Sequence, residues 1–105
     1  MRHDAMLMIR TDLLNRIDAL AGQCGHVKLA RLCAEVDTIR RTARTYGLEP
    51  LERLATKLET ALAFDGKGAV IHSYLDLMRD AAGCEDARPE VASTYLAALS
   101  LRLGA

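Results

Sequence analysis

Apolar residues recur every three or four positions in five successive stretches of this chain, and polar residues fill the positions between them. This spacing is typical of amphipathic helices, whereas strands alternate apolar and polar residues. It predicts five helices: from about 4 to 22, from about 26 to 46, from near 50 to a turn at 65–68, from that turn to a break at 83–86, and from near 89 to about 103.

The apolar stripes of these helices predict which residues form the core. The stripe of the second helix comprises Leu29, Leu32, Val36, Ile39 and Ala43 and closes with Tyr46, and that of the fifth comprises Ala92, Tyr95, Leu96, Leu99 and Leu103. Leu101 points almost opposite to Leu99 and falls outside the stripe. It is expected either as an isolated surface leucine or as a contact with a partner subunit.

Glycine and proline mark the ends of the predicted helices. Gly47 is the expected stop of the second helix, and Pro50 and Pro89 suit the first turn of the helices that follow them. Because the connections are only a few residues long, successive helices should run antiparallel. The predicted fold class is therefore all-α: an antiparallel up-down four-helix bundle over about 4–83, plus a C-terminal fifth helix over about 89–103. Residues 1–105 are expected to form one domain.

Composition narrows the class of protein further. Half of the 105 residues are hydrophobic, with no Trp and one Phe, so the core must be aliphatic. A formal net charge of zero argues against a dedicated nucleic-acid binder, which needs a basic surface. Cys24, Cys33 and Cys84 are odd in number and widely spaced, which favours free thiols in a reducing compartment. The apolar run at 5–9 is too short for a signal peptide or a membrane span, so a soluble, cytoplasmic protein is expected.

Few residues suggest enzymatic or metal chemistry. His26 is expected at the start of the second helix, and His72 on the solvent side of the fourth, near Asp76. No two histidines share a helix face at close spacing, and no Cys/His cluster has the spacing of a zinc site, so no metal is predicted. A strand followed by a Gly-rich phosphate loop is also absent from the pattern, and no cofactor is expected.

The densest group of charges lies in the second half of the second helix. At 100° per residue, Asp37 falls at the boundary between the buried stripe and solvent, with Arg40, Arg41 and Arg44 around it and Cys33 on the same edge. The simplest interpretation is an exposed i,i+4 ion pair between Asp37 and Arg41.

The same stretch resembles the motif of histidine phosphotransfer (HPt) domains. That motif has a phosphorylated histidine, then a lysine three residues on, a glycine four on, a small residue six on and a glycine ten on. Those positions are held here by Asp37, Arg40, Arg41, Ala43 and Gly47. The resemblance covers about residues 11–83 and departs from the family at two important positions, because Asp37 lacks the nitrogen nucleophile and Arg41 places a long side chain where partners approach the helix.

The resemblance implies a four-helix phosphotransfer fold in a phosphorelay or two-component system. With the histidine replaced, it implies a pseudo-phosphotransfer module that binds a response-regulator receiver or a histidine kinase without carrying phosphate. The protein is accordingly expected not to be an enzyme. The residues expected to dock the partner are Cys33, Asp37, Arg40, Arg41 and Arg44.

Two other functions remain open from the sequence. The chain is compatible with an active phosphocarrier that uses His72 as its phosphoacceptor. It is also compatible with a helical interaction module unrelated to phosphorelays, including a homodimer formed through the fifth helix.

Overall fold

The computed structural model describes residues 2–23, 25–26, 28–64, 68–86 and 88–104, with the side chains of 2–4 left aside. Five helices follow one another in this part of the chain: α1 (Arg2–Gln23), α2 (Leu29–Thr45), α3 (Glu49–Phe64), α4 (Gly68–Gly83) and α5 (Pro89–Arg102). The predicted all-α fold class is confirmed, and the helix boundaries agree to within about three residues. The predicted turn at 65–68 and Cys24 fall largely or wholly outside the described residues.

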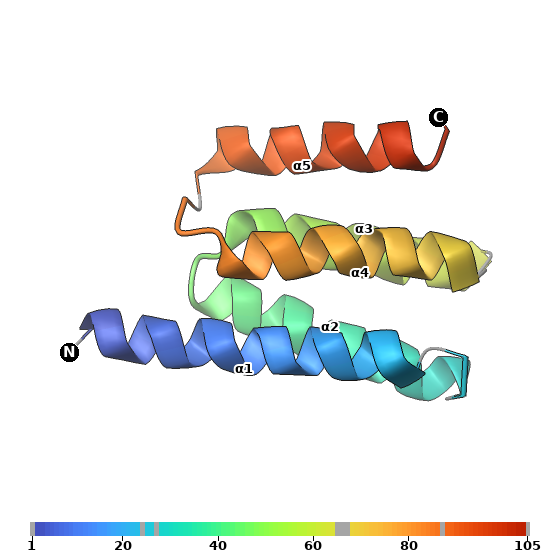
Figure 1. The fold of residues 1–105 in the computed structure, drawn as a ribbon, viewed down its shortest axis with the longest axis horizontal. Helices are drawn as coiled ribbons and strands as arrows, with labels where there is room; N and C mark the ends of the chain where they lie inside the picture. The colour runs from blue at the N-terminus through green and yellow to red at the C-terminus, as the bar shows by residue number, and fades with distance from the viewer. Residues whose placement is uncertain (1, 24, 27, 65–67, 87, 105) are drawn as a thin grey trace.

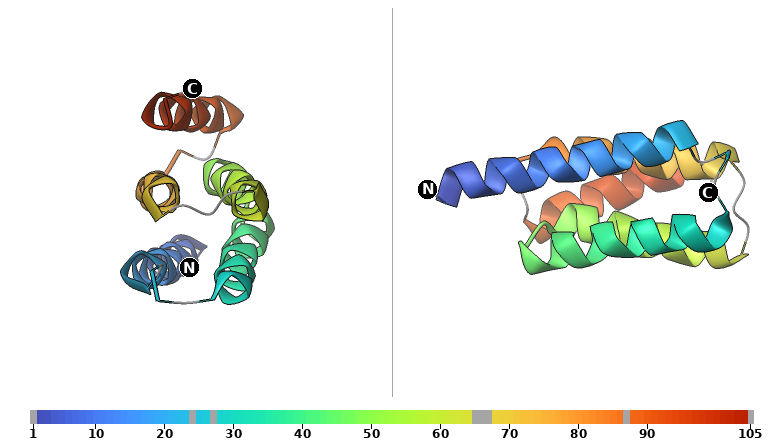
Figure 2. Two further views of the ribbon diagram at one scale, coloured as in Figure 1. Left: turned by 90° about the vertical axis from the view of Figure 1, so that its right-hand side faces the viewer. Right: turned by 90° about the horizontal axis from the view of Figure 1, so that it is seen from below.

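Successive helices run in opposite directions and pack in three layers (Figures 1 and 2). α1 and α2 form one layer, α4 and α3 the next, and α5 alone the third. α1 to α4 close a four-helix bundle, because α2 packs on α1 and α3, and α4 packs on α3 and back on α1. α5 packs on α3 and α4, on the side away from α1 and α2. The fifth helix, which the sequence left unplaced, is therefore an addition to the bundle.

The core is almost wholly aliphatic, as the composition predicted, and Tyr74 is the one aromatic side chain among its described buried residues. Its fully buried side chains include Leu13 and Ile17 of α1, and from the other helices Val36, Ile39, Leu51, Leu54, Leu58, Leu75 and Met78. Burial of such side chains is the main favourable term in folding a chain of this size, at about 1.5–3 kcal/mol for each large aliphatic residue. No buried polar or charged residue occurs among those described.

Two members of the predicted stripe of α2 are not buried. Leu29 is 53% exposed and Tyr46 is 45% exposed, so the prediction for both was wrong. Leu29 is the first residue of α2, and Tyr46 caps its last turn. Periodicity gives the direction in which a side chain points, but at a helix end the neighbouring helices need not extend far enough to cover it.

The turn between α2 and α3 sets the antiparallel pairing of these two helices. Gly47 has φ +70°, a left-handed conformation that costs glycine nothing sterically. The N–H of Gly47 donates to the carbonyl of Arg44 (3.3 Å), and the N–H of Leu48 donates to the carbonyl of Ala43 (2.8 Å). These two bonds make a Schellman cap, and buried Leu48 packs into the core beside the helix that it closes. Gly47 therefore ends α2, and this prediction is confirmed.

Candidate functional site

The outer edge of α2 is the region that the sequence marked as a candidate site. Val36, Ile39 and Ala43 are fully buried and anchor the helix on the bundle. Their neighbours in sequence, one position on, must then lie about 100° away around the helix. Asp37 and Arg40 consequently lie at the rim of the core, where 35% and 25% of their side-chain surface remains exposed. Arg41 lies farther out, with 67% of its side chain exposed.

Asp37 is bound by two arginines of its own helix. Arg40 donates from its terminal nitrogen to Asp37 Oδ1 at 2.7 Å and from Nε to the same oxygen at 3.2 Å. Arg41 Nε lies 2.9 Å from Asp37 Oδ2. Both carboxylate oxygens therefore face a guanidinium group. The predicted i,i+4 pair with Arg41 is present, and the structure adds a second pair with Arg40.

A further acid reaches this cluster from α3. Arg40 Nε also donates to Glu59 Oε1 at 3.2 Å, so a single guanidinium joins Asp37 to Glu59 across two helices. Sequence reasoning did not include Glu59 in the site. A signal was available, since Asp37 and Glu59 lie eleven residues before and after Leu48. Residues equally distant from the turn of an antiparallel hairpin lie side by side.

The four side chains form what we call the α2 edge cluster: Asp37, Arg40, Arg41 and Glu59. Hydrogen bonds from Arg40 hold the pKa of the Asp37 carboxyl below its usual value, and the charges of Arg40 and Arg41 act in the same direction. Partial burial raises the pKa of Glu59, although attraction to Arg40 opposes the shift. The hydrogen bond to Asp37 raises the pKa of Arg40. With both acids ionised the cluster has no net charge, and Asp37 is kept as a carboxylate.

The other two predicted docking residues lie on either side of Asp37 along α2, Cys33 one turn before it and Arg44 two turns after it. Arg44 is exposed, and within the described residues its side chain forms no ion pair. Cys33 is half-buried, carries a free thiol, and packs against the core. The structure thus brings three of the five predicted residues into contact, leaves Arg44 exposed at the surface, and turns Cys33 partly inward.

His26 and His72 lie away from the α2 edge cluster. His72 is exposed on α4, as predicted. His26 does not begin α2, because α2 starts at Leu29 and the N–H of His26 closes a turn on the carbonyl of Gln23 (2.7 Å). The predicted neighbour of His72, Asp76, has a carboxylate oxygen 3.9 Å from the guanidinium of Arg102 on α5.

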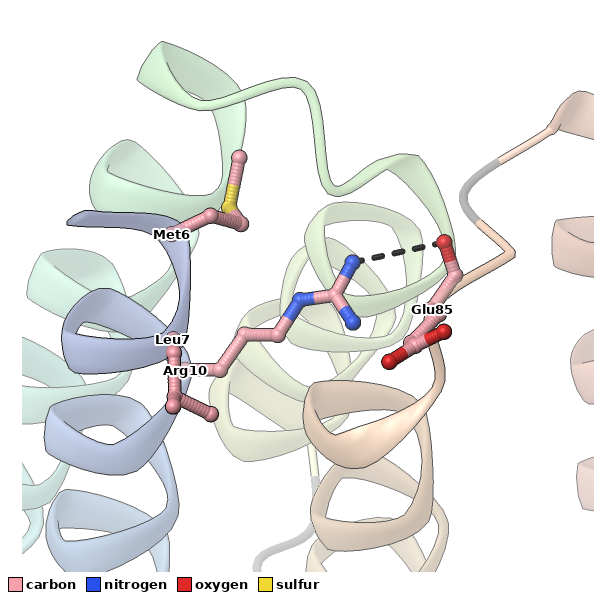
Figure 3. A pocket seen from close by; sticks show the side chains of 4 residues that line it. All are labelled: Met6, Leu7, Arg10 and Glu85. Atoms are coloured by element: carbon pink, nitrogen blue, oxygen red, sulfur yellow. Dashed lines mark hydrogen bonds between the residues drawn. The ribbon is translucent and has the colours of Figure 1, made fainter. Parts of the chain in front are cut away.

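A separate small pocket lies where α1 meets the connection between α4 and α5 (Figure 3). Met6, Leu7, Arg10 and Glu85 line it. Arg10 reaches across the pocket and donates to the backbone carbonyl of Glu85 at 3.3 Å, while its Nε is buried without a hydrogen-bond partner. Nothing in the sequence singled out Arg10. This hydrogen bond joins α1 to the segment that leads into α5.

Among the residues that the structure describes, no three His, Cys, Asp or Glu side chains are placed to hold a metal ion. None of the described helices is both long enough and apolar enough to cross a membrane. Comparison of the chain with protein-family models, with curated proteins and with solved structures found no match.

Proposed function

We propose that this protein is a pseudo-phosphotransfer module, which binds a receiver domain or a histidine kinase through the outer edge of α2 without carrying a phosphoryl group. The observation that carries the proposal is the position of Asp37 and its pairing with two arginines. It occupies the position of the phosphorylated histidine in the HPt-like pattern, and two guanidinium groups hold its carboxylate at the rim of the core.

The surroundings of Asp37 favour binding over phosphoryl transfer. Receivers phosphorylate an aspartate with the help of a metal ion held by further acids. Asp37 instead has arginine partners that keep it ionised and occupy both of its oxygens. An aspartate in this setting resembles a fixed negative charge more than a nucleophile. The arginines that bind it lie at the surface of α2.

The arginines supply the chemistry for an acidic partner. Arg41 is two-thirds exposed and Arg44 is exposed one turn farther on, so both lie on the outward side of α2. Arginine forms paired hydrogen bonds with carboxylates and phosphates, and the active site of a receiver domain is acidic. A partner carboxylate can replace Asp37 as the acceptor for Arg41, since exposed ion pairs of this kind are weak and exchange readily.

A binding experiment tests the docking surface. Isothermal titration of the protein with a panel of receiver domains should reveal at least one that binds. Arg41→Ala combined with Arg44→Ala should weaken that complex by roughly tenfold or more, as expected for central interface arginines. Arg53→Ala is the matched control, because Arg53 is half-exposed and forms an i,i+4 pair with Glu49 (3.2 Å) on α3. Absence of binding to any receiver or kinase, or equal loss in the control, would refute the proposal.

A phosphorylation experiment tests the absence of transfer. Incubation with a phosphorylated receiver should leave the protein without acid-labile phosphate. Asp37→His should accept phosphate slowly, and Asp37→His with Arg41→Gly should accept it faster, because the second change clears the approach to position 37. Equal rates in the two variants would show that Arg41 does not obstruct access. Label on the unchanged protein that His72→Ala abolishes would instead make it an active phosphocarrier.

A further inference from the structure

Arg40 and Arg41 are neighbours in sequence, but they differ in how available they are to another molecule. Arg40 makes three hydrogen bonds to two acids, two to Asp37 Oδ1 and one to Glu59 Oε1, and 25% of its side chain is exposed. Arg41 is paired with Asp37 Oδ2 at 2.9 Å, and 67% of its side chain is exposed. The additional bond of Arg40 comes from α3, because Glu59 is the one member of the α2 edge cluster that lies outside α2.

Helix packing holds Glu59 beside Arg40. Leu58 and Leu62 of α3 are buried in the core, so Glu59, one position after Leu58, lies at the rim of the helix. α2 packs along α3, and this places the rims of the two helices side by side (Figure 2). Because both acids are anchored on packed helices, their effective concentration at Arg40 is high, and a partner from solution must displace them to bind this guanidinium group.

Glu59 also lowers the net charge of the edge. Asp37 and Glu59 balance the charges of Arg40 and Arg41, and exposed Arg44 adds one positive charge to them. Without the Glu59 carboxylate, the same edge would carry two net positive charges and a guanidinium group with one acid partner fewer. An acidic partner is attracted more strongly to the second arrangement than to the first.

We infer that Glu59 is an intramolecular competitor of the acidic partner, which occupies Arg40 and limits the docking surface to Arg41 and Arg44. This inference rests on the docking function proposed for α2 and adds a residue that sets its strength. Glu59 offers Arg40 the same carboxylate chemistry that the partner would offer. Glu59 is thus a positioning residue that acts through Arg40, and loss of its charge makes the α2 edge bind acids more tightly.

Isothermal titration with the tightest-binding receiver domain of the panel measures the competition. Glu59→Gln keeps the size of the side chain and removes its charge, and it should tighten the complex by about two- to fivefold, the range for release of one partly exposed ion pair. Glu52→Gln is the matched control, because Glu52 is also half-buried, two turns earlier on the same face of α3, and forms no ion pair among the described residues. It should tighten the complex less. Unchanged or weaker binding by Glu59→Gln would overturn the inference.

The same titration in an Arg40→Gln background separates competition from a general effect of charge. If Glu59 acts by occupying Arg40, then Glu59→Gln should give no gain in affinity once Arg40 has been replaced. The helical circular dichroism spectrum of each variant checks that the bundle is intact. A gain of equal size with and without Arg40 would show that Glu59 acts only through net charge, and it would contradict its role as a competitor.

Inorganic phosphate is a probe that needs no receiver. In nuclear magnetic resonance spectra of the arginine Nε–H groups, added phosphate should shift the signals of Arg41 and Arg44 in the unchanged protein but not that of Arg40. In Glu59→Gln, phosphate should shift the Arg40 signal as well. An Arg40 signal that responds equally in both proteins, or in neither, would refute the inference. If this pattern holds but no receiver or kinase binds, the function proposed for α2 fails, and the competition for Arg40 stands.

Discussion

The outer edge of α2 and the outer side of α5 are both solvent-facing helix surfaces, but they differ in charge. Charged side chains dominate the first, and uncharged side chains make up most of the second. The α2 edge cluster is crowded with charge, but its two acids and two arginines largely neutralise one another. The side of α5 turned away from α3 and α4 carries no charged residue between Val91 and Leu101, and it exposes Leu101 to solvent. A high density of charged residues is therefore not in itself a measure of unsatisfied binding capacity.

The two helices also differ in how firmly they are attached. α2 buries Leu32, Val36, Ile39 and Ala43 along its whole length and is joined to α3 by a capped turn. α5 fully buries only Ala92 and Leu99, and Tyr95 hydrogen-bonds to Asp80 of α4 at 2.5 Å. We therefore expect α2 to be part of the cooperative core, and α5 to be the part of the bundle that opens most easily.

The largest expected effect on stability compares the loss of a buried side chain from α2 with the loss of one from α5. Ile39→Ala removes a fully buried side chain of α2 and should lower the free energy of unfolding by about 2–5 kcal/mol. Leu96→Ala removes a half-buried side chain of α5 and should cost about 1 kcal/mol. Urea denaturation of both variants gives the comparison. Equal costs would mean that α5 belongs to the same core as α2.

Substitution in the turn after α2 should give the next largest effect on stability. Gly47→Ala places a Cβ at φ +70° and should destabilise the protein by about 1–2 kcal/mol, although no neighbouring atom obstructs the Cβ. Gly22→Ala is the control, because Gly22 lies within α1 without a positive φ and has equally open surroundings. That change should be stabilising, by up to about 1 kcal/mol. If both variants shift the urea midpoint in the same direction, the left-handed cap is not what holds this turn.

Tyr95→Phe tests the polar attachment of α5. Burial, together with the hydrogen bond to Asp80, raises the pKa of Tyr95, so the phenol remains a donor across the neutral range. The change should cost about 0.5–1.5 kcal/mol, the usual net value of one hydrogen bond. It should also speed hydrogen exchange in α5 more than in α2. Uniform acceleration over all helices would show that α5 does not open separately.

A double-mutant cycle measures the tie between α2 and α3. Arg40→Ala and Glu59→Ala together should destabilise the protein less than the sum of the two single changes, because each alone removes the same contact. The coupling should be smaller than the effect of Tyr95→Phe, since both side chains are partly exposed. Strict additivity would mean that the bridge between these helices has no energetic role.

The smallest expected effect is on the pH dependence of the free energy of unfolding in the acid range. The pKa of Asp37 is lower in the folded protein than its ordinary value of 3.8, so its contribution to stability is present above that pH and is lost as the pH falls below it. Glu59, whose pKa is raised, changes in the opposite sense. The unfolding free energy of Asp37→Asn should therefore fall less between neutral pH and acid than that of the unchanged protein. Parallel curves would contradict the pairing of Asp37 with Arg40.

Much of this molecule follows from the order of its residues. The five helices, their antiparallel order, the stop at Gly47 and the pairing of Asp37 with Arg41 follow from spacing along a single helix or from a short turn. These are local properties, because helical geometry sets which residues share a face.

Only the tertiary structure decided which surfaces meet. It placed α5 on the α3–α4 layer, brought Glu59 to Arg40, and left Leu29 and Tyr46 exposed at the ends of their helix. Hydrophobic periodicity shows that a face is apolar, but it does not say which apolar face will cover it or how far along the helix that cover extends. Those choices depend on the packing of all five helices at once, where burial is non-directional and any apolar stripe is chemically acceptable to any other.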